Sequence, residues 1–171
     1  LTHASNALLA TNTGITNAML NSATDVERQS LINLVRTGEF GDIIHSEPAV
    51  VIYPDPDGNP TTNDARTLIF VGANDGLLHA IDDATGGELW SFVPQDQLGR
   101  LYRLKDADHD YFVDGSPIVY DGTGQKLLII GERRGGDHYT VLDITTYDAP
   151  RHLYNIGPTI LDPNSTNTPD T

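Results

Sequence analysis

Residues 69–90 read IFVGANDGLLHAIDDATGGELW, and this stretch decides the fold. An apolar run ends where Asn74-Asp75-Gly76 begins, and these three residues accept the positive φ angles of a tight hairpin turn. A second apolar run follows at 77–82, and a turn at 84–87 leads into a third run at 88–92. Short apolar runs separated by turn residues predict antiparallel strands joined as a meander.

The pattern extends in both directions and then repeats. An apolar run at 48–53 precedes the meander, so the first unit has four strands. The same order of apolar runs and turn residues recurs at 116–120, 126–131, 140–145 and 151–154. A tandem four-stranded unit that is apolar on both faces predicts propeller blades packed face to face. Two unrelated meanders are the alternative.

The residues before the first unit predict a short helix. Thr24 and Glu27 have the spacing of a capping box and Gly38 can end a helix, so we expect a helix over 25–36. The predicted fold class is all-β, a partial β-propeller of two four-stranded antiparallel blades with a short N-terminal helix. The predicted organisation is a lead-in with this helix at 1–40, blade 1 at 41–100, blade 2 at 101–156, and a polar tail or linker at 157–171.

Two blades are too few to close a propeller, because closed propellers have about 4 to 8 blades. The polar tail has too few apolar residues to build another blade. We therefore expect a second polypeptide, further copies of the chain or a missing segment to cover the outer faces of the two blades. The chain begins with Leu1 and shows no signal peptide, so we expect a processed product or a part of a longer polypeptide.

The composition excludes several classes of function. The net charge is −14, from 24 acidic and 10 basic residues, and this excess of negative charge repels nucleic acids and anionic membrane surfaces. No apolar stretch approaches the roughly 20 residues that cross a bilayer, so we expect no membrane insertion. The absence of cysteine excludes disulfides, zinc–thiolate sites and cysteine nucleophiles. Divalent cations or basic protein surfaces suit such a chain.

Four stretches carry a resemblance to a known family. Residues 69–90, 41–48, 109–117 and 142–145, in their order and spacing, resemble the first two blades of the C-terminal propeller of the PilY1 family of type IV pilus tip and adhesion proteins. The resemblance implies a structural or adhesive module that binds proteins or surfaces in pilus assembly, adhesion or motility, and that is not an enzyme. It implies pilus or filament proteins as partners. It also implies a location outside the cell or on its surface, on a pilus or fimbrium, or in the periplasm during transit.

A second resemblance supports an alternative. Residues 80–90 are similar to the repeat of pyrroloquinoline-quinone-type propellers, which implies a fragment of a quinone-dependent dehydrogenase. Three observations weigh against this alternative. The sequence contains only one copy of the repeat, it has no vicinal cysteine pair, and two blades cannot enclose the cofactor. A third hypothesis is an outer-membrane assembly scaffold built on the same propeller repeat.

The acidic loop at 106–114 is a candidate calcium site. Asp106, Asp108, Asp110 and Asp114 occupy positions 1, 3, 5 and 9, which is the ligand spacing of a calcium loop. The loop lacks the glycine of position 6 and has Pro117 where a bidentate glutamate would stand, so a solvated loop between the blades is the alternative. PilY1 proteins are known as calcium binders, but their loop cannot be matched residue by residue to this one. A second acidic loop at 55–63 has the same spacing with weaker ligands.

The remaining polar residues predict structural roles. We find no nucleophile elbow, phosphate-binding loop or zinc-protease motif, which fits a chain that is not an enzyme. The six histidines do not cluster along the sequence, so we expect neutral, hydrogen-bonded structural roles for them. Residues 131–136 form the only compact basic patch, which we interpret as a hairpin tip able to contact an acidic partner. Trp90 is predicted to pack between the blades.

Overall fold

The computed structural model describes residues 7–55, 65–106 and 109–158, and within them it contains two four-stranded antiparallel sheets. Both sheets are meanders, with the strand orders β1-β2-β3-β4 and β5-β6-β7-β8. The strands are β1 (Ala49–Tyr53), β2 (Arg66–Gly72), β3 (Leu78–Asp82), β4 (Glu88–Phe92), β5 (Ile118–Gly122), β6 (Gln125–Gly131), β7 (Tyr139–Asp143) and β8 (Arg151–Ile156). The predicted fold class is confirmed.

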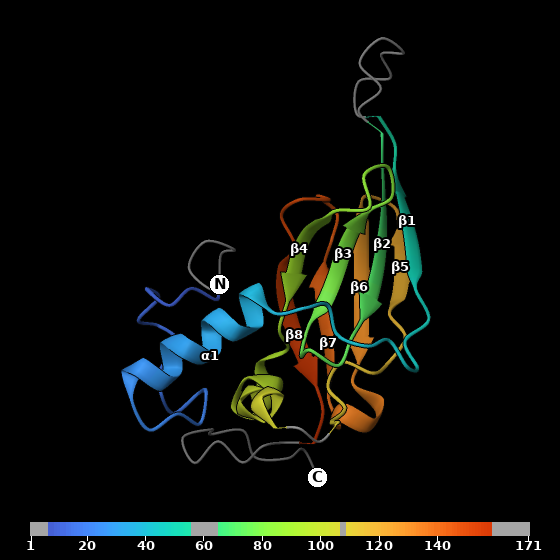
Figure 1. The fold of residues 1–171 in the computed structure, drawn as a ribbon. Coiled ribbons are helices and arrows are strands. Elements are labelled where there is room, and N and C mark those ends of the chain that lie inside the picture. Colours follow the sequence, from blue (N-terminus) through green and yellow to red (C-terminus); the bar gives the residue numbers. More distant parts are fainter. Residues whose placement is uncertain (1–6, 56–64, 107–108, 159–171) are drawn as a thin grey trace.

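The two sheets stack face to face around one apolar core (Figure 1). Alternate side chains of a strand point to opposite faces, so one face of each sheet supplies this core. Phe70 and Trp90 come from the first sheet and Leu128, Ile130 and Leu142 from the second, and all five are buried. The shared core therefore requires the apolar strands of both four-stranded units.

Trp90 lies between the blades, as predicted. Only 8% of its surface is exposed, and its ring centroid lies 5.6 Å from that of Phe70. Its indole Nε1–H donates a hydrogen bond of 2.8 Å to the carbonyl of Tyr147, which belongs to the second blade. A matching bond of 2.8 Å runs from the Tyr53 hydroxyl to the Ile144 carbonyl. Two side-chain donors of blade 1 are thus paired with backbone carbonyls of blade 2 at the edge of the shared core.

The opposite faces of both sheets expose several large apolar side chains, although Val71, His79 and Val141 on these faces are buried. In β5, Ile118 and Tyr120 alternate with the half-buried Val119, and the register places Ile118 beside Ile129 on the outward face. Tyr154 lies on the same face, because β8 pairs it with Val141 and β6 pairs Val141 with Ile129. More than half of the surface is exposed for each of Val50, Ile52, Ile118, Tyr120, Tyr139, Tyr154 and Ile156.

The N-terminal helix α1 spans Asp25–Thr37 and confirms the predicted helix to within one residue. The Thr24 side chain accepts from the Glu27 amide at 3.2 Å, as the capping-box pattern predicts, while the Glu27 carboxylate accepts from the amide of Ala23 at 2.8 Å. Gly38 follows as the C-cap.

A second helical segment, the 3₁₀ helix η2 at Gln95–Lys105, connects the two blades and crosses the boundary predicted at residue 100. Leu101 of η2 and Leu31 of α1 share a second apolar core at one end of the sheets. Sequence reasoning assigned no element to this segment, and its N-terminus indeed has no side-chain cap. Its position matters because it carries one wall of the pocket described next.

Candidate functional site

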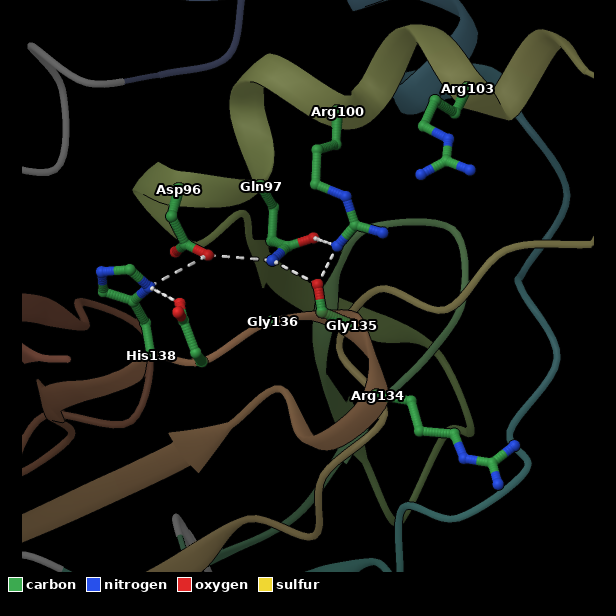
Figure 2. Close-up of a pocket in the computed structure, with 9 residues that line it drawn as sticks. Asp96, Gln97, Arg100, Arg103, Arg134, Gly135, Gly136 and His138 are labelled. Carbon is green, nitrogen blue, oxygen red and sulfur yellow. Dashed lines mark hydrogen bonds and ion pairs between the residues drawn. The ribbon is translucent and has the colours of Figure 1, made fainter. Parts of the chain in front are cut away.

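An open pocket of about 580 Å³ lies between η2 and the connection from β6 to β7, where the one-turn helix η3 (Arg133–Gly135) is located (Figure 2). Its lining residues carry both signs of charge, and none of them has an aliphatic or aromatic hydrocarbon side chain. The lining residues are Asp96, Gln97, Arg100, Arg103, Arg134, Gly135, Gly136, Asp137 and His138. The pocket therefore lies between the segment that leaves blade 1 and a loop of blade 2.

Arg100 holds three chain segments together at one side of this pocket. One guanidinium nitrogen donates to the side chain of Gln97 at 3.2 Å and to the Gly135 carbonyl. The other donates to Asp110 at 3.1 Å and to the Tyr111 carbonyl at 3.0 Å. Because residues three apart eclipse each other in a 3₁₀ helix, Gln97 and Arg100 face the same loop. Figure 2 shows both side chains converging on the Gly135 carbonyl.

Asp96, Glu132 and His138 form a compact cluster beside this network. One potential ligand atom from each residue lies within 4.8 Å of the other two. The His138 Nδ1 atom lies 3.9 Å from Asp96 Oδ2 and 2.7 Å from Asp137 Oδ1. Asp96 Oδ2 also accepts from the Gln97 amide at 2.9 Å, so a buried side chain fixes the orientation of the carboxylate.

Glu132 is the most deeply buried member of the cluster, with 2% of its surface exposed. Burial and then the neighbouring Asp96 carboxylate raise the pKa of Glu132 to about 8, although the His138 backbone N–H and the Gln97 amide act in the opposite direction. Neither donor reaches a Glu132 oxygen at the distance and angle of a normal hydrogen bond. The carboxyl groups of Asp96 and Glu132 are thus close together with few hydrogen-bond donors to stabilise their charged forms.

The predicted calcium ligands have different surroundings. Asp106 is the C-cap of η2, and Asp108 lies outside the described residues. Asp110 forms ion pairs with Arg100 and Arg103 at 3.1 and 3.0 Å. Asp114 is buried and its Oδ2 atom lies 2.8 Å from His45 Nδ1, whereas its buried Oδ1 atom has no hydrogen-bond partner. The second predicted loop falls largely on residues 56–64, which lie outside the described residues.

Two of the stretches that carry the family resemblance lie side by side. His109 Nε2 lies 2.8 Å from the Asp42 carboxylate, and Asp114 contacts His45 as described. The Ser116 hydroxyl accepts from the Glu47 amide at 3.0 Å. Residues 41–48 of blade 1 and residues 109–117 of blade 2 are therefore joined by several side-chain contacts where the blades meet.

Two histidines and the patch at 131–136 have acidic neighbours in the structure. His138 lies with Asp96 and Glu132, and His79 lies between the carboxylates of Asp75 and Glu88. Burial lowers the pKa of His79, but hydrogen bonds and charge from both carboxylates outweigh burial and raise it. In the patch at 131–136, Arg133 and Arg134 are exposed, whereas the Glu132 side chain is buried.

Sequence reasoning missed the cluster of Asp96, Glu132 and His138. Its members are contributed by η2 and by the β6–β7 connection, and their spacing in the sequence matches no metal motif. One weak signal is available, a glutamate directly after the apolar run of β6 in a segment that is otherwise basic or glycine.

Among the described helices, none is long and apolar enough to span a membrane.

Comparison with known proteins finds relatives that are named PilY1. No family model matches it. It is 34% identical over 146 residues to the type IV pilus biogenesis factor PilY1 of Pseudomonas aeruginosa, which covers 71% of this chain and 12% of that protein. It is 32% identical over 143 residues to a PilY1 homolog of Xylella fastidiosa, again with 71% of this chain and 12% of the relative.

A solved structure, the C-terminal domain of PilY1 from Pseudomonas aeruginosa, is 33% identical and covers 53% of this chain and 19% of that one, with a TM-score of 0.39. The chain thus spans about 12% of the length of the curated relatives that it matches. The resemblance to the PilY1 family that the sequence motifs predict is confirmed for this part of those proteins.

Proposed function

We propose that the chain is a structural and adhesive module of a type IV pilus or another extracellular filament, and that it acts by protein or surface binding. Its relatives are named as type IV pilus biogenesis factors, which supports a role in pilus biogenesis. Contact rather than chemistry is the mode of action we propose. A location on the cell surface, or in the periplasm during transit, follows from this role.

The exposed outer faces of the sheets carry the proposal. Ile118, Tyr120 and Tyr154 expose apolar surface on the outward face of the second sheet, and Val50 and Ile52 do so on the first. Exposed apolar surface of this kind marks an interaction site. We propose that further four-stranded sheets, from a second polypeptide or a missing segment, pack on these faces as neighbouring blades.

Calcium at the acidic loop is a further part of the proposal. The buried, unpartnered Oδ1 atom of Asp114 supports it, because a hard cation satisfies such an oxygen. The ion pairs of Asp110 with Arg100 and Arg103 weigh against it, since an ion would compete with two guanidinium groups. Asp106 and Asp108 would complete the ligand set.

The quinone-dependent dehydrogenase is the less favoured alternative. In that alternative an aromatic residue such as Trp90 would stack on the cofactor. Trp90 instead packs against Phe70 and donates its Nε1–H to Tyr147, so its ring is already engaged within the core. Titration with the quinone tests the alternative, which requires a saturable spectral change.

Chromosomal substitutions in the host strain test the proposed function. Ile118→Asp places a charge on the outer face, and Val26→Asp places the same charge on an exposed apolar position of α1. We expect Ile118→Asp to lower the number of surface pili at an unchanged level of the protein, and Val26→Asp and Ile118→Val to leave piliation intact. Equal piliation in all three strains would contradict the proposal.

A further inference from the structure

Buried carboxyl oxygens without a hydrogen-bond partner mark the cluster of Asp96, Glu132 and His138. Both Glu132 oxygens and the Oδ1 atom of Asp96 are buried and lack a hydrogen-bond partner. Buried polar atoms in proteins are nearly always satisfied, so such a group requires an explanation. Here the unpartnered oxygens of a 98%-buried residue point toward a second carboxylate and an imidazole.

The nearby arginines do not neutralise these carboxylates. Arg100 and Arg103 form ion pairs with Asp110, and Arg134 lies over the Tyr111 ring at 5.3 Å with a hydrogen bond to the Tyr111 hydroxyl. None of the ion pairs among the described residues joins a lysine or arginine to Asp96 or Glu132. The cluster therefore offers carboxyl lone pairs that neither a hydrogen bond nor a basic side chain occupies, as a cation site does.

We propose that Asp96, Glu132 and His138 bind one divalent transition-metal ion, of which Zn²⁺ is the representative. Each residue offers a ligand atom, and the mutual separation below 4.8 Å suits ligands of one ion. Zinc accepts imidazole nitrogen together with carboxylate oxygen, whereas Ca²⁺ and Mg²⁺ take oxygen ligands almost exclusively. The imidazole of His138 thus separates this site from the calcium loop proposed at 106–114.

The surroundings of the cluster resemble the outer shell of a metal site. Ligand carboxylates in metalloproteins are held by further hydrogen bonds, and the Gln97 amide holds Asp96 in this way. Gln97 is itself anchored to the Gly135 carbonyl at 3.2 Å. Asp96 and His138 line the open pocket, which provides an entry path for the ion and room for water at its remaining coordination positions (Figure 2).

The bound ion would clamp η2 to the loop between β6 and β7. Asp96 belongs to η2, which leaves blade 1, and Glu132 and His138 belong to the connection between two strands of blade 2. A shared ion would therefore set the position of one blade relative to the other. This consequence is independent of any role in pilus biogenesis.

Equilibrium dialysis of the full chain against Zn²⁺ after treatment with chelator tests the inference. We expect one Zn²⁺ per chain, retained in an excess of Ca²⁺. Glu132→Gln, which keeps the shape of the side chain, and His138→Gln should each weaken binding by at least about tenfold, because each removes a direct ligand. Asp106→Asn and His109→Gln are matched controls from the acidic loop and should bind as the wild type does.

A readout on the unmodified chain keeps the test independent of variant folding. Imidazole ¹⁵N resonances should shift on addition of one equivalent of Zn²⁺ for His138 alone among the six histidines. Zn²⁺ binding that survives Glu132→Gln, displacement of the ion by equal Ca²⁺, or a shift at His109 in place of His138 would each overturn the proposal.

Discussion

Individual polar side chains connect the two blades at the rim of the shared core. Trp90 donates to Tyr147, Tyr53 donates to Ile144, and His45 contacts Asp114. Each contact joins residues far apart in the sequence. A hydrogen bond of this kind contributes only about 1 kcal/mol net, but a buried partner left without it costs about 1 to 3 kcal/mol.

Replacement of Trp90 separates its packing from its hydrogen bond. Trp90→Ala should lower the free energy of unfolding by roughly 3 to 5 kcal/mol, whereas Trp90→Phe, which keeps a ring and loses the Nε1–H, should cost about 1 to 3 kcal/mol. Urea unfolding measures both. Because Trp90 is the only tryptophan, its emission also reports its burial directly, and red-shifted emission of the native chain would contradict the packing role.

The raised pKa of His79 predicts a dependence of stability on pH. His79 is buried between Asp75 and Glu88 under the ring of Phe40, and the two carboxylates favour the charged imidazole. A folded-state pKa above the unfolded value of 6.5 means that this contribution is fully present below about pH 6.5 and is lost as pH rises through the folded pKa.

The stability difference between the wild type and His79→Gln should therefore shrink between slightly acidic and slightly alkaline pH. Urea unfolding at several pH values measures this difference, and NMR titration of His79 gives its pKa directly. A His79 pKa below the ordinary histidine value, or a difference that grows with pH, would show that burial outweighs the carboxylates.

Calcium should raise the melting temperature if the acidic loop binds it. A ligand present at a hundredfold excess over its dissociation constant stabilises the folded state by about 2.7 kcal/mol. Asp108→Ala should remove most of the calcium-dependent rise, while Asp137→Ala, an exposed carboxylate of the pocket, should leave it. Identical melting curves in calcium and in chelator would mean that the loop is only solvated.

At the level of elements, the strands and α1 were predictable because their signals are local. Period-two apolar runs and the turns at Gly76 and Gly86, which both have positive φ, define the strands of blade 1, and the capping box defines α1. The helix η2 has no such signal. Its position depends on Leu101, which packs against α1 and so acts only after the chain has folded.

The same reasoning explains which parts of the candidate site escape the sequence. The acidic loop at 106–114 is contiguous, so its spacing is visible. Asp96, Glu132 and His138 meet only when η2 is placed against the β6–β7 connection. Likewise Asp110 and Asp114 looked available as calcium ligands, because their partners Arg100 and His45 lie elsewhere in the chain.

The capping contact of α1 gives a prediction at the same level. Thr24→Ala removes the side chain that accepts from the Glu27 amide and should cost about 1 kcal/mol. Thr37→Ala, at the other end of the helix, removes a bond to a carbonyl that already lies in the last turn and should change stability by less than about 0.5 kcal/mol. Chemical denaturation compares the two, and a larger loss for Thr37→Ala would refute the assigned cap.

For the whole molecule, each of the stacked sheets buries one face in the shared core and exposes part of the other. The net charge of −14 favours solubility, but the outward faces still expose the apolar side chains of Ile52 and Ile118. In a complete propeller, each of these faces packs against a neighbouring blade. The central claim is therefore that the two sheets are consecutive blades whose outer faces require partners.

Light scattering on the purified 171-residue chain, coupled to size-exclusion chromatography, tests this claim most directly. We predict concentration-dependent self-association of the wild type, because its apolar outer faces have no neighbouring blade. Ile52→Asp and Ile118→Asp together should shift the chain toward the monomer, whereas Val26→Asp on α1 should not. A wild-type chain that stays a compact, cooperatively melting monomer at high concentration would contradict the account, because two blades would then suffice by themselves.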